Sequence, residues 1–398
     1  MTARALVALA LSAVLGGCVT WEFEPVPEIE AQVVEITPET NEPTTEPRIP
    51  EPEIPDPVSV MIDQEIMDRD LRAKLAGLMM VTIEGMDPAV HQEFIESIPV
   101  AGFLMLKTNL VGGVEPTRLF VEELQGDREF PLLIAVDQEG SPIARIAGDS
   151  FPGARVLGQD SVEATAEAFR ARQELVHSSG ANLNFGVVAD VSGGQGAYIH
   201  DRAFSTDPDV VTTHVSEAVR AQVPGVAQTL KHFPGHGLVF ADTHKEVPLS
   251  TISLTDWQVT HQPPFVAGIA AGAEVVMMAH IRVATVSQDP ASLSNDWVDI
   301  LRRDLGFEGV VVTDDLSMLQ DSGEPEYQDP AATMVAALVA GNDLLLLAVD
   351  PSEGSGYAVY DEVLDALVDS VERGEVSLEQ VERSLERVLA LRSQLAHP

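Results

Sequence analysis

The chain has 398 residues, of which 45% are hydrophobic, so most of it can fold around a large core. It carries 63 acidic residues against 23 lysines and arginines, which gives a formal net charge of −40. This balance excludes electrostatic binding to nucleic acid, which needs a basic surface, and it opposes attraction to an anionic membrane. Solubility, or adaptation to a salty environment, accounts for such acidity without any functional role. The single cysteine excludes an intrachain disulfide and a cysteine-based metal site.

Residues 1–17 have the pattern of an export signal. Arg4 precedes an apolar run over residues 5–15, which is too short for a permanent membrane-spanning helix but fits a secretory signal. The run leads into the sequence LGGC, which resembles a bacterial lipobox whose cysteine, here Cys18, carries lipid. We expect acyl chains on Cys18 to anchor an exported protein to a bacterial membrane, on its periplasmic or extracellular face. The alternative is an ordinary signal peptide with an incidental cysteine.

Residues 18–57 have the composition of an extended tether. From residue 22 to residue 56 carboxylates dominate, Arg48 is the only basic residue and prolines recur. Low hydrophobicity, charge repulsion and proline prevent such a segment from forming a core. We therefore expect an acidic, proline-rich tether that holds the folded domain, residues 58–398, away from the membrane. No specific motif supports the alternative, a partner-binding segment.

After about residue 58, apolar runs alternate with amphipathic stretches. The apolar runs predict strands at residues 78–83, 102–106, 132–136, 181–191, 226–230, 274–279, 309–313 and 343–348. The helical segments between and after them are predicted at residues 162–178, 209–221, 296–304, 331–340, 357–373 and 378–395. Strands that alternate with helices are typical of a parallel α/β fold, and this number of units predicts a single-domain (β/α)8 TIM-like barrel.

The densest group of functional side chains follows the fifth predicted strand. The sequence KHFPGHG begins at Lys231 and carries His232 and His236, and the tripeptide DTH follows with Asp242 and His244. Because proline and glycine prevent a helix, we expect the lysine and the three histidines on a bent loop. The carboxyl end of a strand is where parallel α/β folds place their chemistry. The structural alternative is a Gly/Pro turn with solvated histidines.

Two kinds of chemistry can be weighed for these histidines. His232 and His236 stand four residues apart, which brings two imidazoles together only on a helix, so neither a metal site nor another cofactor is predicted. A carboxylate beside an imidazole fixes its tautomer and favours its protonated form. Asp242 and His244 can therefore act together as a general acid and then a general base near neutral pH.

Charged side chains also follow other predicted strands. Asp137 leaves the third strand and Arg145 comes soon after, so the two can bind polar groups of a ligand or form a salt link with each other. Arg202, in the loop after the fourth strand, is either a ligand-facing residue or a salt-bridge partner. Asp314 and Asp315 come directly after the seventh strand, and we expect Asp315 to cap the helix that follows.

Together these motifs resemble glycoside hydrolase family 3, in its β-N-acetylhexosaminidase branch of the short single-barrel type. The family patterns KHFPGHG with a later DxH, IDQEGGRVxR, NFAPVxDV and DRSFSxDP are similar to residues 231–244, 135–145, 184–191 and 201–208. The resemblance covers about residues 64–395. The sequence departs from the family at residues 141–143, where SPI replaces GRV and an arginine is lost.

The resemblance implies a retaining exo-β-N-acetylglucosaminidase. Asp314 matches the family nucleophile, and His244 with Asp242 behind it matches the acid/base pair. The residues that match the family's ligands for the terminal sugar are Asp137, Arg145, Arg202, Lys231 and His232. The expected substrates are oligosaccharides or glycopeptides that contain N-acetylglucosamine, such as cell-wall fragments or chitin-derived oligosaccharides.

Some interpretations stay open at this point. Asp190 is expected to be structural, and His280 can line the pocket or be a satisfied core histidine. A β-glucosidase or a glycosyl phosphorylase could use the same fold, although the offset of the DTH tripeptide argues against the glucosidase. A noncatalytic sugar-binding lipoprotein is the alternative from another class. The departure at residues 141–143 supports it, and the presence of Asp314, Asp242 and His244 together opposes it.

Overall fold

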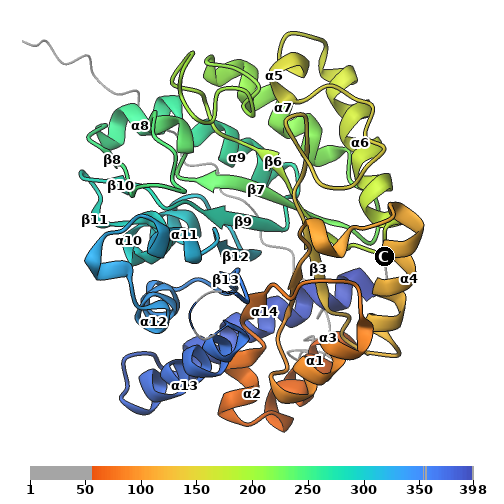
Figure 1. Cartoon of the computed structure of the whole chain (residues 1–398). Coiled ribbons are helices and arrows are strands. Elements are labelled where there is room, and N and C mark those ends of the chain that lie inside the picture. Colours follow the sequence, from red (N-terminus) through yellow and green to blue (C-terminus); the bar gives the residue numbers. More distant parts are fainter. Residues whose placement is uncertain (1–55, 353, 355, 397–398) are drawn as a thin grey trace, which may run out of the picture. The chain divides into compact units, whose positions relative to one another are not determined.

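Eight parallel strands form the centre of the structure (Figure 1). The computed structural model describes residues 56–352, 354 and 356–396. The strands are β1 (Met79–Val81), β2 (Gly102–Leu104), β3 (Leu133–Val136), β6 (Leu183–Val188), β7 (Ala227–Phe233), β9 (Val275–Met278), β12 (Val310–Thr313) and β13 (Leu345–Leu347). Their order is β12-β9-β7-β6-β3-β2-β1-β13, and a parallel bridge between Val312 and Leu344 joins the two edges. The predicted (β/α)8 TIM-like barrel is therefore confirmed.

The apolar runs of the sequence form strands because both faces of this sheet are covered. In β12 the sequence VVVT is buried at every position, and β6 is buried along its whole length. Parallel strands of this kind face a packed barrel interior on one side and helices on the other, so they are apolar without alternation. All eight predicted strands are present, although several are shorter than predicted.

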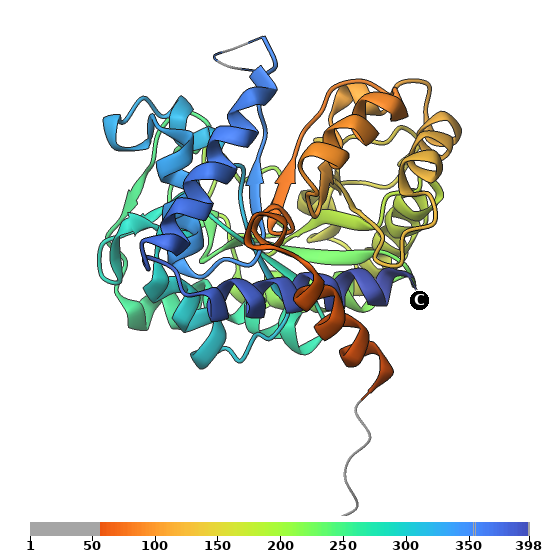
Figure 2. The same ribbon diagram turned by 90° about the horizontal axis from the view of Figure 1, so that it is seen from below.

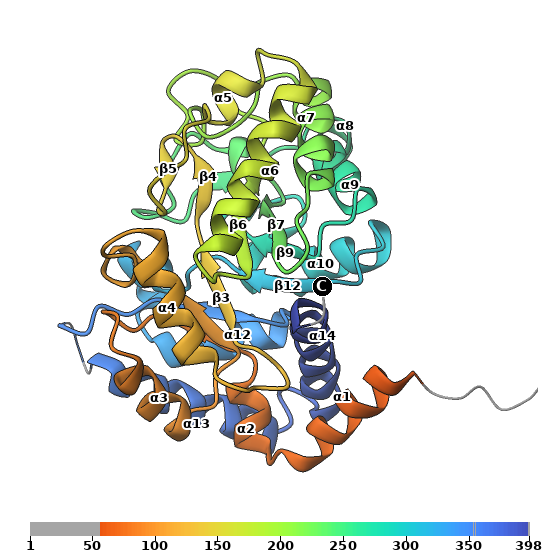
Figure 3. The ribbon, with the colours of Figure 1, turned by 90° about the vertical axis from the view of Figure 1, so that its right-hand side faces the viewer.

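Helices surround the barrel (Figures 1 and 3). The main ones are α3 (Pro88–Ser97), α4 (Val114–Gln125), α6 (Val162–Ser178), α7 (Pro208–Arg220), α9 (Gln262–Ala270), α10 (Asn295–Asp299), α12 (Pro330–Ala340) and α13 (Val359–Glu372). Shorter helices are α2 (Leu71–Ala76), α5 (Ala154–Leu157), α8 (Leu254–Thr260) and α11 (Ser317–Asp321). Many begin at a side-chain cap, such as Ser161 on α6 and Asp207 on α7. The helix predicted at residues 296–304 is α10 followed by a π-helical turn, Ile300–Asp304.

The C-terminal helix α14 (Leu378–Ala396) closes the amino end of the barrel (Figure 2). Arg392 donates to the carbonyl oxygens of Phe130 and Pro131, just before β3, at 2.7 and 2.8 Å. Asp343, just before β13, is fully buried and accepts hydrogen bonds from Ser384 at 2.9 Å and from Arg387 at 3.1 Å. The helix α1 (Pro57–Asp68) packs on α14. The carboxyl ends of the strands lie at the opposite end of the barrel.

The expectation of a bent loop from Lys231 is wrong in part. Lys231, His232 and Phe233 continue β7, and the chain bends only at Pro234. The strand extends because its neighbours supply partners: the N–H of Ala189 donates to the Lys231 carbonyl, and the N–H of Ala279 donates to the Phe233 carbonyl. Tertiary pairing thus overrides the local turn signal.

The sequence did not predict two small sheets around the barrel mouth, in which every pair is antiparallel except β8 with β10. β4 (Gln138–Gly140) pairs with β5 (Ile143–Ala144). A three-stranded sheet contains β8 (Leu249–Ser250), β10 (Arg282–Val283) and β11 (Ser287–Pro290). Strands of two to four residues are too short to show a periodic pattern.

The export signal, Cys18 and nearly all of the tether lie outside the described residues. The division at residues 1–17, 18–57 and 58–398 therefore stays a prediction. Within the part of the chain that the structure describes, no helix has both the length and the apolar composition needed to cross a membrane.

Glu274, at the amino end of β9, gives the fold a pH dependence that can be tested. Burial raises the pKa of Glu274 to about 7 from an ordinary value of 4.5, although the Gln228 N–H donates to its carboxylate at 3.0 Å. The folded state thus holds the proton more tightly than the unfolded chain, and stability falls as the pH rises from about 4.5 to about 7. We expect Glu274→Gln to raise Tm on the order of 3 °C at pH 8 and to change it little at pH 5. Calorimetry at both pH values measures this, and equal shifts would contradict it.

Candidate active site

A cavity of about 260 Å³ lies at the carboxyl ends of the strands. Lys231 and His232 of β7, together with the segments that follow β3, β6, β7 and β12, supply its polar side chains. Leu104 of β2 and Leu346 of β13 are among its apolar walls. The polar lining consists of Asp137, Glu139, Arg145, Tyr198, Arg202, Lys231, His232, His236, Thr243, His244, Asp314 and Asp315. The cavity therefore gathers all the predicted catalytic and sugar-binding residues except Asp242, which stands behind His244.

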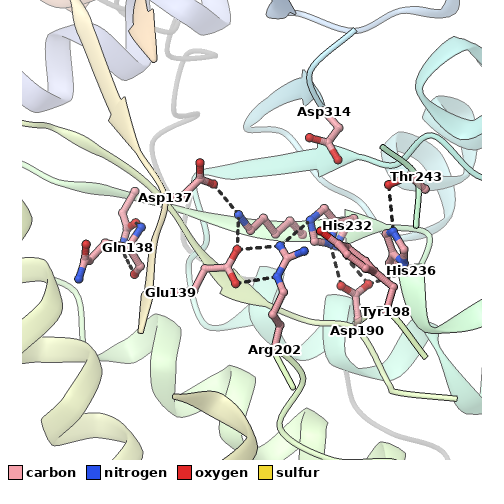
Figure 4. A network of polar contacts seen from close by, with 12 residues as sticks. Asp137, Gln138, Glu139, Asp190, Tyr198, Arg202, His232, His236, Thr243 and Asp314 are labelled. Carbon is pink, nitrogen blue, oxygen red and sulfur yellow. Dashed lines mark hydrogen bonds and ion pairs between the residues drawn. The ribbon is translucent and has the colours of Figure 1, made fainter. Parts of the chain in front are cut away.

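Glu139 is the centre of a charged cluster in this cavity (Figure 4). Arg202 donates to both of its oxygens, at 2.9 Å from Nε and 2.7 Å from Nη2, and Lys231 Nζ lies 2.7 Å from Oε1. Burial by itself raises the pKa of Glu139, but the charges of Arg202 and Lys231 outweigh it and hold the pKa at about 2. Glu139 is therefore a carboxylate under all ordinary conditions.

Lys231 connects this cluster to Asp137. Its Nζ donates to Asp137 Oδ1 at 2.8 Å in addition to its contact with Glu139. Burial lowers the pKa of Lys231, but the two carboxylates more than offset this, so the pKa lies above its usual value. A buried ammonium between two carboxylates presents fixed donors and acceptors to a ligand.

His232 is fixed by Asp190, which is fully buried beneath it. Nδ1 of His232 donates to Asp190 Oδ2 at 2.8 Å, and Asp190 Oδ1 accepts from the backbone N–H groups of His232 and His236, at 3.2 and 2.6 Å. Because Nδ1 donates, Nε2 of His232 is free to accept from Arg202 Nη2 at 3.2 Å. Asp190 thus has the structural position expected for it.

His236 is buried next to His232, with ring centroids 5.5 Å apart. Burial, and then the neighbouring His232, lower the pKa of His236 to about 4, and its Nε2 forms a 3.0 Å hydrogen bond with the hydroxyl of Thr243. Among the described residues, no group of three or more His, Cys, Asp or Glu side chains is arranged to hold a metal ion.

Asp242 and His244 form a pair in the loop after β7. Asp242 Oδ1 accepts from Nδ1 of His244 at 2.8 Å and from its backbone N–H at 3.1 Å, and Lys245 Nζ lies 3.0 Å from the other oxygen. Burial raises the pKa of Asp242, but these donors outweigh it and the pKa lies below its usual value. Because Nδ1 of His244 faces an anion, its Nε2 is left for proton exchange. The His244 side chain is 53% exposed and lines the cavity.

Asp314 directly follows β12 and lines the cavity. Its N–H donates to the Met278 carbonyl at 2.9 Å, and its Oδ1 accepts from the Asp315 N–H, also at 2.9 Å. Burial alone raises the pKa of Asp314. The imidazoles of His232 and His280, together with the Asp315 N–H, outweigh burial and bring the pKa below its usual value. Asp314 is therefore ionised at neutral pH.

Asp315 has the opposite electrostatic character. Burial raises the pKa of Asp315 to about 6, in spite of hydrogen bonds from the N–H and hydroxyl of Ser317 and from the N–H of Ala348. These bonds join the start of α11 to the end of β13. The N-cap position of α11 is Leu316, however, so the expectation that Asp315 caps this helix is met only in part. Of the two adjacent carboxylates, Asp314 has the lower pKa and keeps an oxygen available for a ligand.

Two open interpretations are settled by these contacts. Within the described residues Arg145 makes no ion pair, because Asp137 pairs with Lys231 instead, so the salt link between Asp137 and Arg145 is not formed. The Arg145 side chain lines the cavity. His280 is fully buried, bonded to the hydroxyl of Ser292 at 2.7 Å and to the carbonyl of Asp315 at 2.8 Å, so it is a satisfied core histidine.

The departure at residues 141–143 falls in the turn between β4 and β5, where Ser141 and Pro142 are exposed and Ile143 lines the cavity. Gln138 holds this hairpin, because its side-chain oxygen accepts from the backbone N–H groups of Arg145 and Ile146 at 3.0 and 2.9 Å. The loop therefore keeps Arg145 at the cavity without the missing arginine.

Glu139 and Tyr198 both line the cavity, and sequence reasoning assigned neither of them to it. Glu139 stands two positions after Asp137, and in an extended chain such residues point to the same side, so this signal was available. Tyr198 lies in the irregular loop between β6 and α7, and nothing in the sequence alone placed it in the cavity.

Comparison with known proteins agrees with this geometry. Residues 70–391 match the glycosyl hydrolase family 3 N-terminal domain. A β-hexosaminidase of Xanthomonas oryzae pv. oryzae (strain KACC10331 / KXO85) is 35% identical over 283 residues, which cover 68% of this chain and 83% of that protein. A β-hexosaminidase of Stenotrophomonas maltophilia (strain K279a) is 35% identical over 285 residues, with the same coverage.

Two solved structures extend the comparison. A glycoside hydrolase family 3 β-N-acetylglucosaminidase from Paenibacillus sp. str. FPU-7 has a TM-score of 0.76 and 32% identity, over 82% of this chain and 63% of that one, which is less than two thirds of its length. A β-N-acetylhexosaminidase from Beutenbergia cavernae DSM 12333 has a TM-score of 0.71 and 28% identity, over 82% of this chain and 99% of that one. The chain thus belongs to glycosyl hydrolase family 3 and is a glycoside hydrolase.

Proposed function

We propose that this chain is a retaining exo-β-N-acetylglucosaminidase that releases a terminal N-acetylglucosamine through a covalent glycosyl-aspartate. The observation that carries the proposal is that an ionised carboxylate, Asp314, and a carboxylate-backed imidazole, His244, line one small cavity. The relatives named β-hexosaminidase and β-N-acetylglucosaminidase support the sugar specificity.

The proposed reaction has two displacements at the anomeric carbon. In the first, Asp314 attacks, the bond to the leaving oxygen breaks, and that oxygen takes a proton from Nε2 of His244. In the second, Nε2 takes a proton from water, the water oxygen attacks, and the Asp314 carboxylate departs. Asp242 stabilises the imidazolium that the first step requires. Two inversions retain the configuration of the sugar.

The terminal sugar is proposed to lie on the charged cluster. Asp137 and Glu139 offer acceptors, Lys231, Arg202 and Arg145 offer donors, and Nε2 of His232 offers a further acceptor. A small cavity with so dense a polar lining suits one terminal sugar rather than the interior of a polymer. Substrates of this kind include cell-wall fragments, glycopeptides and chitin-derived oligosaccharides.

The test of this function compares aryl N-acetyl-β-glucosaminide with the matching aryl β-glucoside, at low and high salt and with and without phosphate. Cleavage of the N-acetyl sugar with release of free sugar is the expected result. Cleavage of the glucoside alone would reassign the specificity, and a sugar phosphate as product would make the enzyme a phosphorylase. A folded protein that binds the sugar but cleaves neither substrate would be a binding protein.

Replacing the proposed acid/base should separate substrates by their leaving groups. His244→Ala is expected to lower kcat/KM for poor leaving groups by about 100-fold or more, and much less for activated aryl groups that leave without a proton. The measurement is a series of aryl N-acetyl-β-glucosaminides of graded acidity. Equal losses for all leaving groups would contradict the acid role.

We also propose that the protein is exported and anchored to a bacterial membrane by lipid on Cys18. The lipobox-like sequence and the acidic tether support this location. Cys18→Ala is expected to move the protein from the membrane fraction to a soluble one when it is expressed in bacteria, because a lipid chain is the anchor. Lipid labelling of the parent protein but not of the variant is the control, and an unlabelled, soluble parent would refute the anchor.

A further inference from the structure

The loop that carries His244 is held mainly by local bonds. Asp242, His244 and Lys245 lie within three residues of one another, so their mutual hydrogen bonds fix the tautomer of His244 but not its place over the cavity. Thr243 provides one tie to the barrel through the buried His236. Another contact, from a different loop, has to set where the exposed His244 side chain stands.

Tyr198, from the loop between β6 and α7, makes that contact. Its hydroxyl lies 3.4 Å from Nδ1 of His244, and the two rings have centroids 5.7 Å apart. Its backbone N–H also donates to the Phe240 carbonyl at 3.0 Å. Both the main chain and the side chain of Tyr198 therefore contact the loop that carries His244. The tyrosine lines the cavity itself.

The Tyr198 ring also contacts residues of the sugar-binding cluster and of the barrel (Figure 4). The guanidinium of Arg202 lies 5.9 Å from its centroid, within the range of a cation–π contact, and the ring of His236 lies 5.6 Å away. Arg202 is in turn fixed by its two hydrogen bonds to Glu139. Tyr198 therefore contacts both the sugar-binding cluster and the loop of the acid/base pair.

We propose that Tyr198 is a positioning residue, which holds the His244 loop against the sugar-binding cluster so that the imidazole reaches the leaving oxygen. This inference rests on the proposed acid/base role of His244. The tyrosine exchanges no proton with the substrate; it acts through its ring and its hydroxyl contact. Loss of the ring should therefore resemble a partial loss of His244, and not a loss of sugar binding.

The test uses the full-length enzyme and the series of aryl N-acetyl-β-glucosaminides of graded leaving-group acidity. Tyr198→Phe keeps the ring and should stay within about 3-fold of the parent on every substrate. Tyr198→Leu fills space without a ring, and its kcat/KM, which reports the glycosylation step, should fall on the order of 10-fold to 100-fold for poor leaving groups but little for the most acidic ones. KM for the terminal sugar should change little. Tyr357→Leu, which alters a tyrosine outside the cavity lining, is the matched control and should leave the series unchanged.

The outcomes separate this inference from the function on which it depends. Suppose that the loss of activity in His244→Ala grows steeply as the leaving group becomes poorer, but the loss in Tyr198→Leu does not change along the series. This result would overturn the role of Tyr198 and keep the mechanism. Flat dependences in both variants would refute the acid role itself. Activity on the most acidic leaving group shows that a variant is folded. If Tyr198→Leu does not fold, Tyr198→His keeps a ring, and it should fall between the phenylalanine variant and His244→Ala; equality with the parent would again overturn the inference.

Discussion

Asp314→Asn should reduce turnover by at least about 10,000-fold while the fold stays intact. The amide has the shape of the carboxylate but cannot form the glycosyl-enzyme ester. The backbone bond from Asp314 to Met278 does not involve the side chain, so β12 should keep its register. Steady-state kinetics with the aryl N-acetyl sugar, together with circular dichroism, measure the two effects.

Asp315→Asn is the matched control for this substitution. The amide oxygen can accept from the N–H groups of Ser317 and Ala348 that now bind Oδ1, and the amide nitrogen can donate to the Ser317 hydroxyl. We expect this variant to keep turnover within about 10-fold of the parent, because Asp315 is held away from the reaction by its own bonds. A glycosyl adduct found by mass spectrometry on a peptide that lacks Asp314, or full activity of Asp314→Asn, would refute the nucleophile.

Glu139→Ala should cost about 3–5 kcal/mol of unfolding free energy, because it leaves buried cations without their partner. Lys231 is buried and the Arg202 side chain is only 10% exposed. Within the described residues, Arg202 makes its carboxylate hydrogen bonds with Glu139 alone. The affinity for the sugar should also fall, since both cations line the cavity. An exposed pair gives the contrast: Glu115→Ala, which removes one of the two partners of Arg118 on α4, should cost far less stability.

The effect of Glu139→Ala should depend on pH with a definite sign. The pKa of Glu139 is about 2 in the folded protein and its ordinary value is 4.5. Its contribution is therefore complete above about pH 4.5 and disappears as the pH falls towards 2. Urea unfolding at pH 7 and at pH 3 should show a smaller difference between parent and variant at the lower pH. A difference that grows in acid would contradict the assigned charge cluster.

The barrel could be predicted from sequence because each strand is apolar, uninterrupted and bounded by a helical segment. The small hairpins could not, since β5, for example, has two residues and no pattern. The continuation of β7 through His232 was missed for a different reason. Its hydrogen-bond partners come from residues 189–190 and 279, which are distant in sequence, so a local turn signal was given too much weight.

The candidate site shows the same division between local and distant information. The pair of Asp242 and His244 could be predicted because both residues lie in one tripeptide, and the structure places them 2.8 Å apart. The partners of Lys231 could not be predicted, because Glu139 and Asp137 follow another strand. No local pattern favours Lys231 over Arg145 as the partner of Asp137.

The packing of α1 on α14 has a consequence for the direction in which this enzyme faces. Because α14 closes the amino end of the barrel, the chain enters the domain at the end opposite the cavity. If the chain is anchored through residues that precede α1, the anchor is joined to the barrel at the end away from the catalytic cavity. The point at which the chain enters the domain then leaves the cavity open to the end of a bulky substrate.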